Sequence, residues 1–357
     1  MNILIDYGAD DGFFAEAALY PNGHMARVTS QYKGLYKVMT NRGETLAELS
    51  GKFRHEATAL SHFPAVGDFV MLRLPDADGS HAVIHHVLKR KSAFARSAVG
   101  FEDQTQIVAA NIDIVFICMS LNNDYNISRL ERYLTVAWNS RALPVVVLTK
   151  SDLCSDLPHT LDEIATIALG VDVVATSAND HTSYDALRSY LKPGATASFI
   201  GSSGVGKSTL INLLAGKEVL RTSPIGENDK GRHTTTSREL LLLPQGGIVI
   251  DTPGMRELGM ESGELSQSFA DIEALAAQCR FDDCRHGAEP GCAVKHALET
   301  GALDARRWAN YQKLGREARY RGLSPRQLEA EKLNGMFESI GGMKKARDFL
   351  RKSDKRR

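Results

Sequence analysis

A glycine-rich octapeptide at residues 201–208, with the sequence GSSGVGKS, constrains this chain more than any other segment. It fits the pattern G-x-x-x-x-G-K-[ST] and lies between an apolar run that ends at Ile200 and a helical run with Leu210, Leu213 and Leu214. Glycines let the backbone direct its N–H groups onto phosphate oxygens at a helix N-terminus. The segment therefore predicts a phosphate loop in a strand–loop–helix unit; the alternative is a glycine-rich turn that matches by chance.

The loop and the residue after it supply the predicted phosphate contacts: Gly201, Ser202, Ser203, Gly204, Val205, Gly206, Lys207, Ser208 and Thr209. We expect Lys207 to neutralise β- and γ-phosphate oxygens and Ser208 to bind Mg²⁺. This loop does not distinguish ATP from GTP, so the base must be recognised elsewhere.

A second motif predicts guanine recognition. Thr149, Lys150, Ser151 and Asp152 directly follow the apolar run at residues 145–148. The Asp152 carboxylate can accept hydrogen bonds from N1–H and the 2-amino group of guanine, a donor pair that adenine lacks. After the next predicted strand, at residues 171–175, Ser177 and Ala178 offer backbone N–H groups to the guanine O6. A solvated Lys-x-Asp loop is the alternative interpretation.

The γ-phosphate is expected to meet two further segments. Asp251 follows a strand at residues 248–250 and is predicted to hold Mg²⁺, while the Gly254 N–H would face the γ-phosphate. Upstream, a threonine run precedes a strand at residues 239–243; Thr234 is the favoured Mg²⁺ ligand and Thr235 the next choice.

Hydrolysis by the chain alone is predicted to be slow. Met255 follows Gly254 where Ras-type GTPases carry a glutamine that orients the attacking water, and an apolar side chain cannot do this. His233 is the candidate catalytic residue, and a surface histidine that contacts a partner is the alternative.

The order of the motifs is permuted. Ordinary GTPases have the phosphate loop first and the guanine motif later, whereas here residues 149–152 come before residues 201–208. A site built from loops at one sheet edge depends on proximity in space, so permutation preserves its chemistry. It leaves the downstream region attached directly after the γ-phosphate sensor.

Three of the five cysteines lie close together with one histidine. Cys279, Cys284, His286 and Cys292 form a complete tetrahedral donor set for one structural zinc ion. A full set leaves no open position, so a role in folding is expected rather than catalysis. Unligated cysteines are the alternative, and the isolated Cys118 and Cys154 are interpreted as core or surface residues.

The pattern of apolar runs, amphipathic stretches and turn signals along the chain predicts four segments. They are an arm without assigned function at 1–27, an OB-type β-barrel at 28–95, an α/β GTPase domain at 96–262, and a helical zinc-binding domain with a basic tail at 263–357. The barrel pattern alone also fits other small barrels.

Lys and Arg balance Asp and Glu at 43 each, so a nucleic-acid footprint must be local. Without an apolar run of about 18 residues or a signal segment, we expect a cytoplasmic protein with no membrane contact.

Together these motifs resemble the RsgA (YjeQ) family of circularly permuted GTPases that depend on the small ribosomal subunit. The resemblance rests on residues 106–113, 149–152, 201–209, 231–236, 251–254, 284–286 and 289–292. It implies an OB barrel, a permuted GTPase core and a zinc-binding helical domain. It also implies late maturation of the small subunit, GTPase stimulation by that subunit, and contact with its rRNA through the barrel and the C-terminal domain. We expect GTP, GDP, Zn²⁺ and Mg²⁺ as ligands, no DNA partner, and a monomer.

Two other interpretations remain open. The chain could be a GTP-loaded switch for a protein partner, with hydrolysis incidental, or an ATP-using P-loop kinase, against which Asp152 argues. The basic tail at residues 344–357 is interpreted as an rRNA contact or, alternatively, as a solvated helix face.

Overall fold

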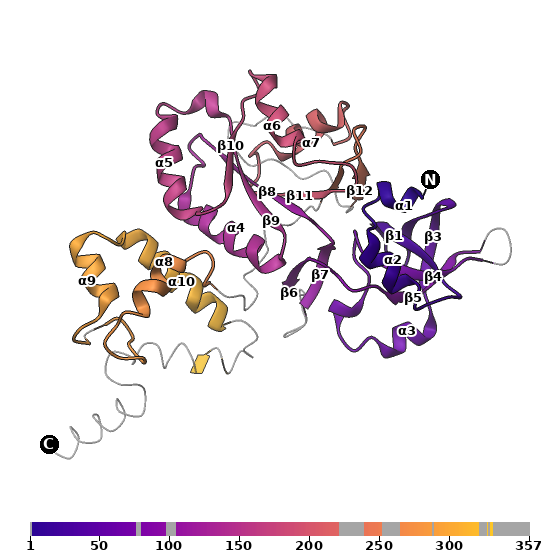
Figure 1. The fold of residues 1–357 in the computed structure, drawn as a ribbon, viewed down its shortest axis with the longest axis horizontal. Helices are drawn as coiled ribbons and strands as arrows, with labels where there is room; N and C mark the ends of the chain where they lie inside the picture. Colours follow the sequence, from indigo (N-terminus) through magenta and orange to yellow (C-terminus); the bar gives the residue numbers. More distant parts are fainter. Residues whose placement is uncertain are drawn as a thin grey trace, which may run out of the picture.

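The computed structural model describes residues 2–75, 80–97, 105–220, 239–251, 265–287, 289–320, 327, 329 and 330. A β-barrel with a short helical arm, an α/β domain and a small helical domain follow one another along the chain (Figure 1). No helix within those residues is long and apolar enough to cross a bilayer.

The barrel closes in the order β1-β2-β3-β5-β4-β1. Its strands are β1 (His24–Gln31), β2 (Tyr36–Thr40), β3 (Gly43–Leu49), β4 (Phe69–Arg73) and β5 (Ala82–Val87), with α3 (Gly51–Glu56) and η1 (Leu60–His62) between β3 and β4. Only β3 and β5 pair in parallel, and the interior is apolar, with Val28, Val38, Val70 and Ile84 fully buried. This five-stranded barrel confirms the predicted OB-type fold.

The arm consists of two short helices packed on the barrel. Asn2 caps α1 (Ile3–Asp6), and Asp10 caps α2 (Asp11–Ala17), each by accepting a backbone N–H. Phe13 packs on Phe69 of β4 with ring centroids 4.2 Å apart. The first barrel strand begins at His24, inside the segment that the sequence assigns to the arm.

The α/β domain has a six-stranded sheet in the order β10-β9-β8-β11-β13-β12, which continues into the barrel through the pair Ser30–Glu239. Its elements are β8 (Ile114–Ser120), α4 (Ile127–Ser140), β9 (Leu143–Thr149), η2 (Ser151–Leu153), α5 (Leu157–Ile167), β10 (Asp172–Ala175), η3 (His181–Tyr184), α6 (Asp185–Arg188), β11 (Thr196–Ile200), α7 (Lys207–Ala215), β12 (Glu239–Leu242) and β13 (Ile248–Asp251). All neighbours are parallel except β12 and β13. The antiparallel β12–β13 hairpin contains the two strands that the sequence predicts at residues 239–243 and 248–250.

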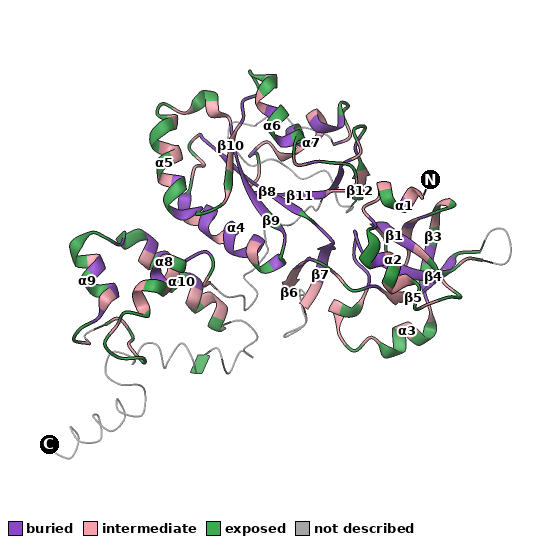
Figure 2. Cartoon of the chain, viewed as in Figure 1, coloured by how far each residue is buried: buried purple, intermediate pink, exposed green. Residues whose placement is uncertain are grey.

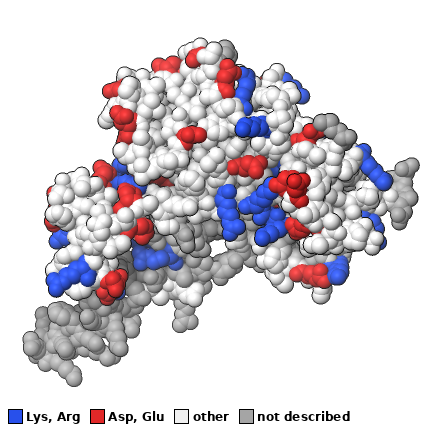
Figure 3. Space-filling model, in the orientation of Figure 1, with Lys and Arg blue, Asp and Glu red and all other residues white. Residues whose placement is uncertain are grey.

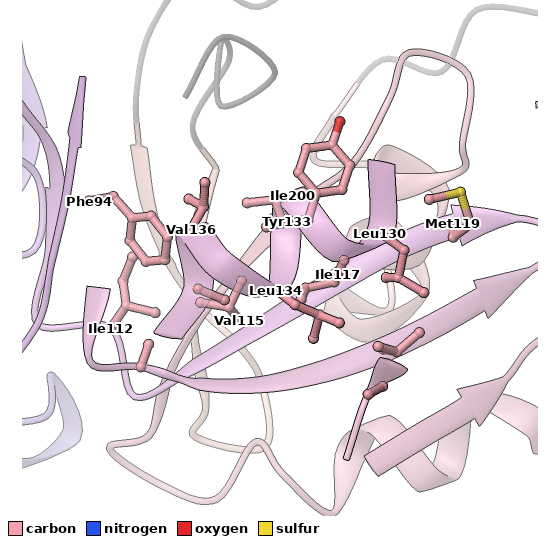
Figure 4. Packing of buried hydrophobic residues seen from close by; sticks show 14 of the residues in the cluster. Phe94, Ile112, Val115, Ile117, Met119, Leu130, Tyr133, Leu134, Val136 and Ile200 are labelled. Carbon is pink, nitrogen blue, oxygen red and sulfur yellow. The ribbon is translucent and has the colours of Figure 1, made fainter. Parts of the chain in front are cut away.

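Successive side chains of β8 point to opposite faces of this sheet, and a hydrophobic core lies on each face. Val115 and Ile117 face α4, where Leu130 and Leu134 cover them (Figure 4). Phe116 packs on the opposite side in the cluster that contains residues of α6 and α7. The buried strands therefore lie between helical layers (Figure 2), as continuous apolar runs predict for a parallel sheet.

Two strands that the sequence pattern does not predict form a separate ribbon: β6 (Ala93–Ser97) and β7 (Thr105–Ala110). The sequence boundary between residues 95 and 96 therefore falls inside β6. Nearby, the buried Arg27 donates hydrogen bonds to Tyr7 O of the arm, Gly67 O of the barrel and Asn111 O after β7. Burial lowers the pKa of Arg27 to about 10.

The described C-terminal helices are α8 (Ala270–Ala276), α9 (Ala293–Thr300) and α10 (Ala305–Tyr320). Arg307 of α10 donates to both oxygens of Asp271 of α8 and, across the domain boundary, to Glu131 Oε1 at 2.8 Å. Asn310 also donates to Glu131. Glu131 is 1% exposed on α4, so the helical domain is attached to the α/β domain through a buried charge.

Candidate functional site

The predicted motifs gather at one edge of the sheet. In chain order the strands run outward from β8 through β9 to β10, and the chain then returns to place β11 on the other side of β8. In parallel α/β sheets, the crevice at such a reversal, beyond the carboxyl ends of the strands, is where ligands bind. The phosphate loop follows β11 at this edge.

The phosphate loop has the backbone shape that its glycines predict. Gly201 has φ +147°, and a Cβ placed there would lie 2.4 Å from the Cys118 carbonyl oxygen. Gly206, with φ +101°, caps the N-terminus of α7. Side chains are strained in these conformations, so glycine lets the loop lie close to β8 and turn sharply into the helix.

Lys207 lies over the first turn of this loop. Its Nζ donates hydrogen bonds to Gly201 O at 2.8 Å and to Ser202 O at 2.6 Å. Ser208 is half-buried in the next position, and Thr209 is exposed. A cation and backbone N–H groups at a helix N-terminus are the chemistry of an anion site.

The guanine motif begins at the end of β9. Lys150 has a left-handed backbone, with φ +55°. The exposed Asp152 carboxylate accepts a hydrogen bond from Ser177 Oγ at 2.6 Å and another from Asn179 Nδ2 at 3.3 Å. The structure therefore brings together the two predicted segments that contain Asp152 and Ser177, and Ala178 is exposed next to Ser177. Sequence reasoning missed Asn179, which lies directly after the predicted Ser177 and Ala178.

Asp251, the last residue of β13, lies beside the same crevice. Burial raises the pKa of its carboxyl, the nearby charge of Lys207 opposes that rise, and Glu239 adds to it. A partly buried carboxylate that feels the charge of Lys207 fits the cation site that the sequence predicts here. Thr234, His233 and Gly254 lie outside the described residues, as does Met255.

A second loop at this edge carries an acidic residue that the motifs do not include. Residues 121–126 connect β8 to α4, and Asn122 Oδ1 accepts from the Asp124 backbone N–H at 3.1 Å. The Asp124 carboxylate accepts a hydrogen bond from Ser202 Oγ of the phosphate loop. The sequence signal that could have identified it is the run of mostly polar residues at 122–126, which follows the apolar run at 114–119.

The four predicted zinc ligands lie together in the helical domain, with all donor atoms within 4.8 Å of one another. The His286 Nδ1 atom is 3.5 Å from the Sγ atoms of both Cys279 and Cys292, and those two sulfurs are 3.9 Å apart. In a tetrahedral zinc site, sulfurs are separated by about 3.8 Å and a sulfur and a nitrogen by about 3.6 Å. The donor set, completed by Cys284, therefore fits one zinc ion.

Comparison with known proteins gives consistent matches. A family model described as RsgA GTPase matches residues 87–261. The small ribosomal subunit biogenesis GTPase RsgA 2 of Lactiplantibacillus plantarum is 49% identical over 345 residues, which cover 96% of this chain and 97% of that protein. The RsgA protein of Opitutus terrae is 46% identical over 346 residues, covering 92% and 94% of the two chains.

Two solved structures have a similar fold. YjeQ from Thermotoga maritima matches with a TM-score of 0.61 and 30% identity, over 83% of this chain and 98% of that one. YloQ, described as a circularly permuted GTPase, matches with a TM-score of 0.59 and 24% identity, over 83% and 95% of the two chains.

Proposed function

Because this chain belongs to the RsgA family of GTPases, we propose that it acts in late maturation of the small ribosomal subunit. Its relatives are named small ribosomal subunit biogenesis GTPases. The observation that carries the proposal is the meeting of the phosphate loop, the guanine motif and Asp251 at one sheet edge, in permuted chain order. In this role the chain hydrolyses GTP to GDP and phosphate.

The nucleotide roles that we propose rest on the sequence motifs, and for the described residues the geometry supports them. Lys207 and the loop N–H groups hold the phosphates; Asp152 accepts from the guanine edge, beside the N–H groups of Ser177 and Ala178. Ser208, Thr234 and Asp251 hold Mg²⁺, which neutralises phosphate charge during phosphoryl transfer. Zinc bound by the Cys₃His cluster stabilises the helical domain.

We further propose that the subunit completes the catalytic site. The chain offers Met255 in place of a water-positioning glutamine, so turnover is slow alone and faster on the subunit. His233 is the proposed residue that positions the water. A His233→Ala variant that kept both basal and subunit-stimulated turnover would refute that assignment.

Contact with rRNA is assigned to the barrel and to the basic residues at 344–357. Residues 344–357 lie outside the described part of the chain. On the face shown in Figure 3, Lys and Arg side chains are interspersed with Asp and Glu and gather next to the barrel. Among the described residues this mixed surface forms no general basic field, so the rRNA contact that we propose is a local one. The protein is proposed to act as a cytoplasmic monomer without DNA or membrane partners.

GTP turnover with purified small subunits tests the proposal, with large subunits as the matched control. We expect stimulation by small subunits only, and competition by GTP but not ATP for nucleotide binding. Equal binding of ATP and GTP would remove the guanine assignment. GTP turnover without any small-subunit stimulation would favour a switch for a protein partner instead.

A further inference from the structure

Asp124 connects the two loops that meet at the reversal of strand order. The loop at residues 121–126 leaves β8, the phosphate loop leaves β11, and these strands are parallel neighbours in the sheet. The Asp124–Ser202 hydrogen bond joins these loops across 78 positions of sequence. No nucleotide-binding motif described above includes Asp124.

The Asp124 side chain is itself held in place. Arg129, in the first turn of α4, donates to both carboxylate oxygens of Asp124 at 2.8 and 2.9 Å. Partial burial opposes the ionised form, but the hydrogen bonds from Ser202 and Arg129 bring the pKa of Asp124 below its ordinary value. The acceptor that Ser202 meets is therefore a fixed carboxylate at neutral pH.

We propose that Asp124 is a positioning residue for the phosphate loop: through Ser202 it holds the first turn of that loop in the shape that receives nucleotide phosphates. This inference rests on the proposed function, because it assumes that the loop binds GTP. Lys207 Nζ donates a hydrogen bond to the carbonyl oxygen of the same residue, Ser202. The serine is therefore held at its side chain by Asp124 and at its backbone by Lys207.

Charge makes this arrangement compatible with a polyphosphate. A lone carboxylate next to the phosphate loop would repel GTP, but the paired Arg129 neutralises it. A loop held in its receptive shape loses less conformational entropy when the ligand binds, which improves affinity without a new ligand contact. The effect should therefore appear mainly in nucleotide affinity rather than in kcat.

The test measures the Kd of a fluorescent GDP analogue and the kcat for GTP in the full chain. Asp124→Ala and Ser202→Ala should each raise Kd by about tenfold, the scale of one hydrogen bond to a charged group. At saturating GTP, kcat should fall by less than about twofold. Asp124→Asn keeps an oxygen acceptor for Ser202 and should restore Kd to within about threefold of the parent.

Two comparisons make the assignment specific. The double variant should bind no more weakly than either alanine variant, because both remove the same interaction. Glu44→Ala removes the acidic partner of Lys37 in the barrel, an ion pair of similar exposure, and should leave Kd at the parent value.

The inference is overturned if the Asp124 and Ser202 variants match Glu44→Ala, or if their effects on Kd multiply in the double variant. A parent chain that neither binds nor hydrolyses GTP would instead refute the proposed function. If Asp124→Ala lowers the melting temperature, Ser202→Ala and Asp124→Asn still decide the question.

Discussion

The hydroxyl of Thr149 donates a hydrogen bond of 2.6 Å to the carbonyl oxygen of Val205. Thr149 begins the guanine motif and Val205 lies in the phosphate loop, and both residues are buried. The bond crosses the carboxyl end of β8, which separates the two parent strands in the sheet. It therefore fixes the base end of the site relative to its phosphate end.

Thr149→Val should weaken nucleotide binding. The substitution keeps the shape but leaves the buried Val205 carbonyl without its partner, which costs about 1 kcal/mol or more, or about fivefold in the Kd of GDP. Thr135→Val is the control, because the Thr135 hydroxyl is also buried but bonds within α4. Equal Kd values for the two variants would contradict the structural role of Thr149.

Asp152→Asn should change the base preference from guanine to xanthine. The amide gives one acceptor and one donor, and xanthine carries an oxygen where guanine has its 2-amino group. We expect GTP affinity to fall by about 100-fold and XTP to bind more tightly than GTP, measured by competition. Asn179→Ala removes only a 3.3 Å contact to this carboxylate and should leave GTP preferred. Unchanged preference in Asp152→Asn would place the base elsewhere.

The α/β domain is largely predictable from sequence because its strands are apolar runs that lead directly into motifs. Residues 145–148 predict β9, because a short, fully apolar run directly before a Lys-x-Asp loop is typical of a buried strand of a parallel sheet. The zinc site is predictable for a similar reason, because its three cysteines and one histidine all fall within residues 279–292. Local signals of this kind do not require knowledge of tertiary contacts.

Features that depend on distant partners are not predictable in this way. Asp124 becomes a site residue only once β8 and β11 are neighbours. The burial of Arg27 likewise depends on carbonyls from three separate segments. An arginine in a strand is expected at the surface until those partners are known, and the pairing of β6 with β7 is not apparent from the sequence pattern.

Arg307→Ala should loosen the helical domain from the α/β domain. It leaves Glu131, which is 1% exposed, without its buried cation at 2.8 Å, so that only the more exposed Arg306 remains nearby, and such a loss costs about 3 kcal/mol. The measurement is denaturant unfolding followed by Trp308 fluorescence in a Trp138→Phe background. Arg306→Ala is the control, because its side chain is 39% exposed and lies 3.6 Å from Glu131; we expect it to cost less than about 1 kcal/mol. Similar losses in both variants would show that the buried pair has no special role.

Removal of zinc should unfold the helical domain and spare the nucleotide site. Cys279, Cys284 and Cys292 contribute to the small core that also holds Phe269 and Leu314. A core with so few apolar residues is expected to depend on the metal for its stability. Cys284→Ser should reduce zinc from about one ion per chain to nearly none, with a loss of helical circular dichroism. Cys154→Ser, outside the cluster, should keep both. Full helicity in metal-free protein would refute a structural role.

Asp251 should make stability depend on pH in a way that Mg²⁺ reverses. Because burial raises its pKa in the folded chain, its contribution to stability is complete below the unfolded pKa of about 3.9 and is lost as pH rises through the folded value. At neutral pH the ionised carboxylate therefore costs stability in protein without Mg²⁺. Bound Mg²⁺ offsets that cost.

Asp251→Asn should accordingly melt at a higher temperature than the parent at pH 7 in the absence of Mg²⁺ and nucleotide, and its advantage should shrink as the pH falls toward 4. Adding GTP and Mg²⁺ should reverse the order, because only the parent keeps the carboxylate that is proposed to bind Mg²⁺ and so gains stability from the bound ligand. The measurement is a thermal melt at several pH values in both conditions. An advantage that grows on acidification would mean that the Asp251 carboxylate is stabilised in its ionised form, and the role assigned to its burial would then be wrong.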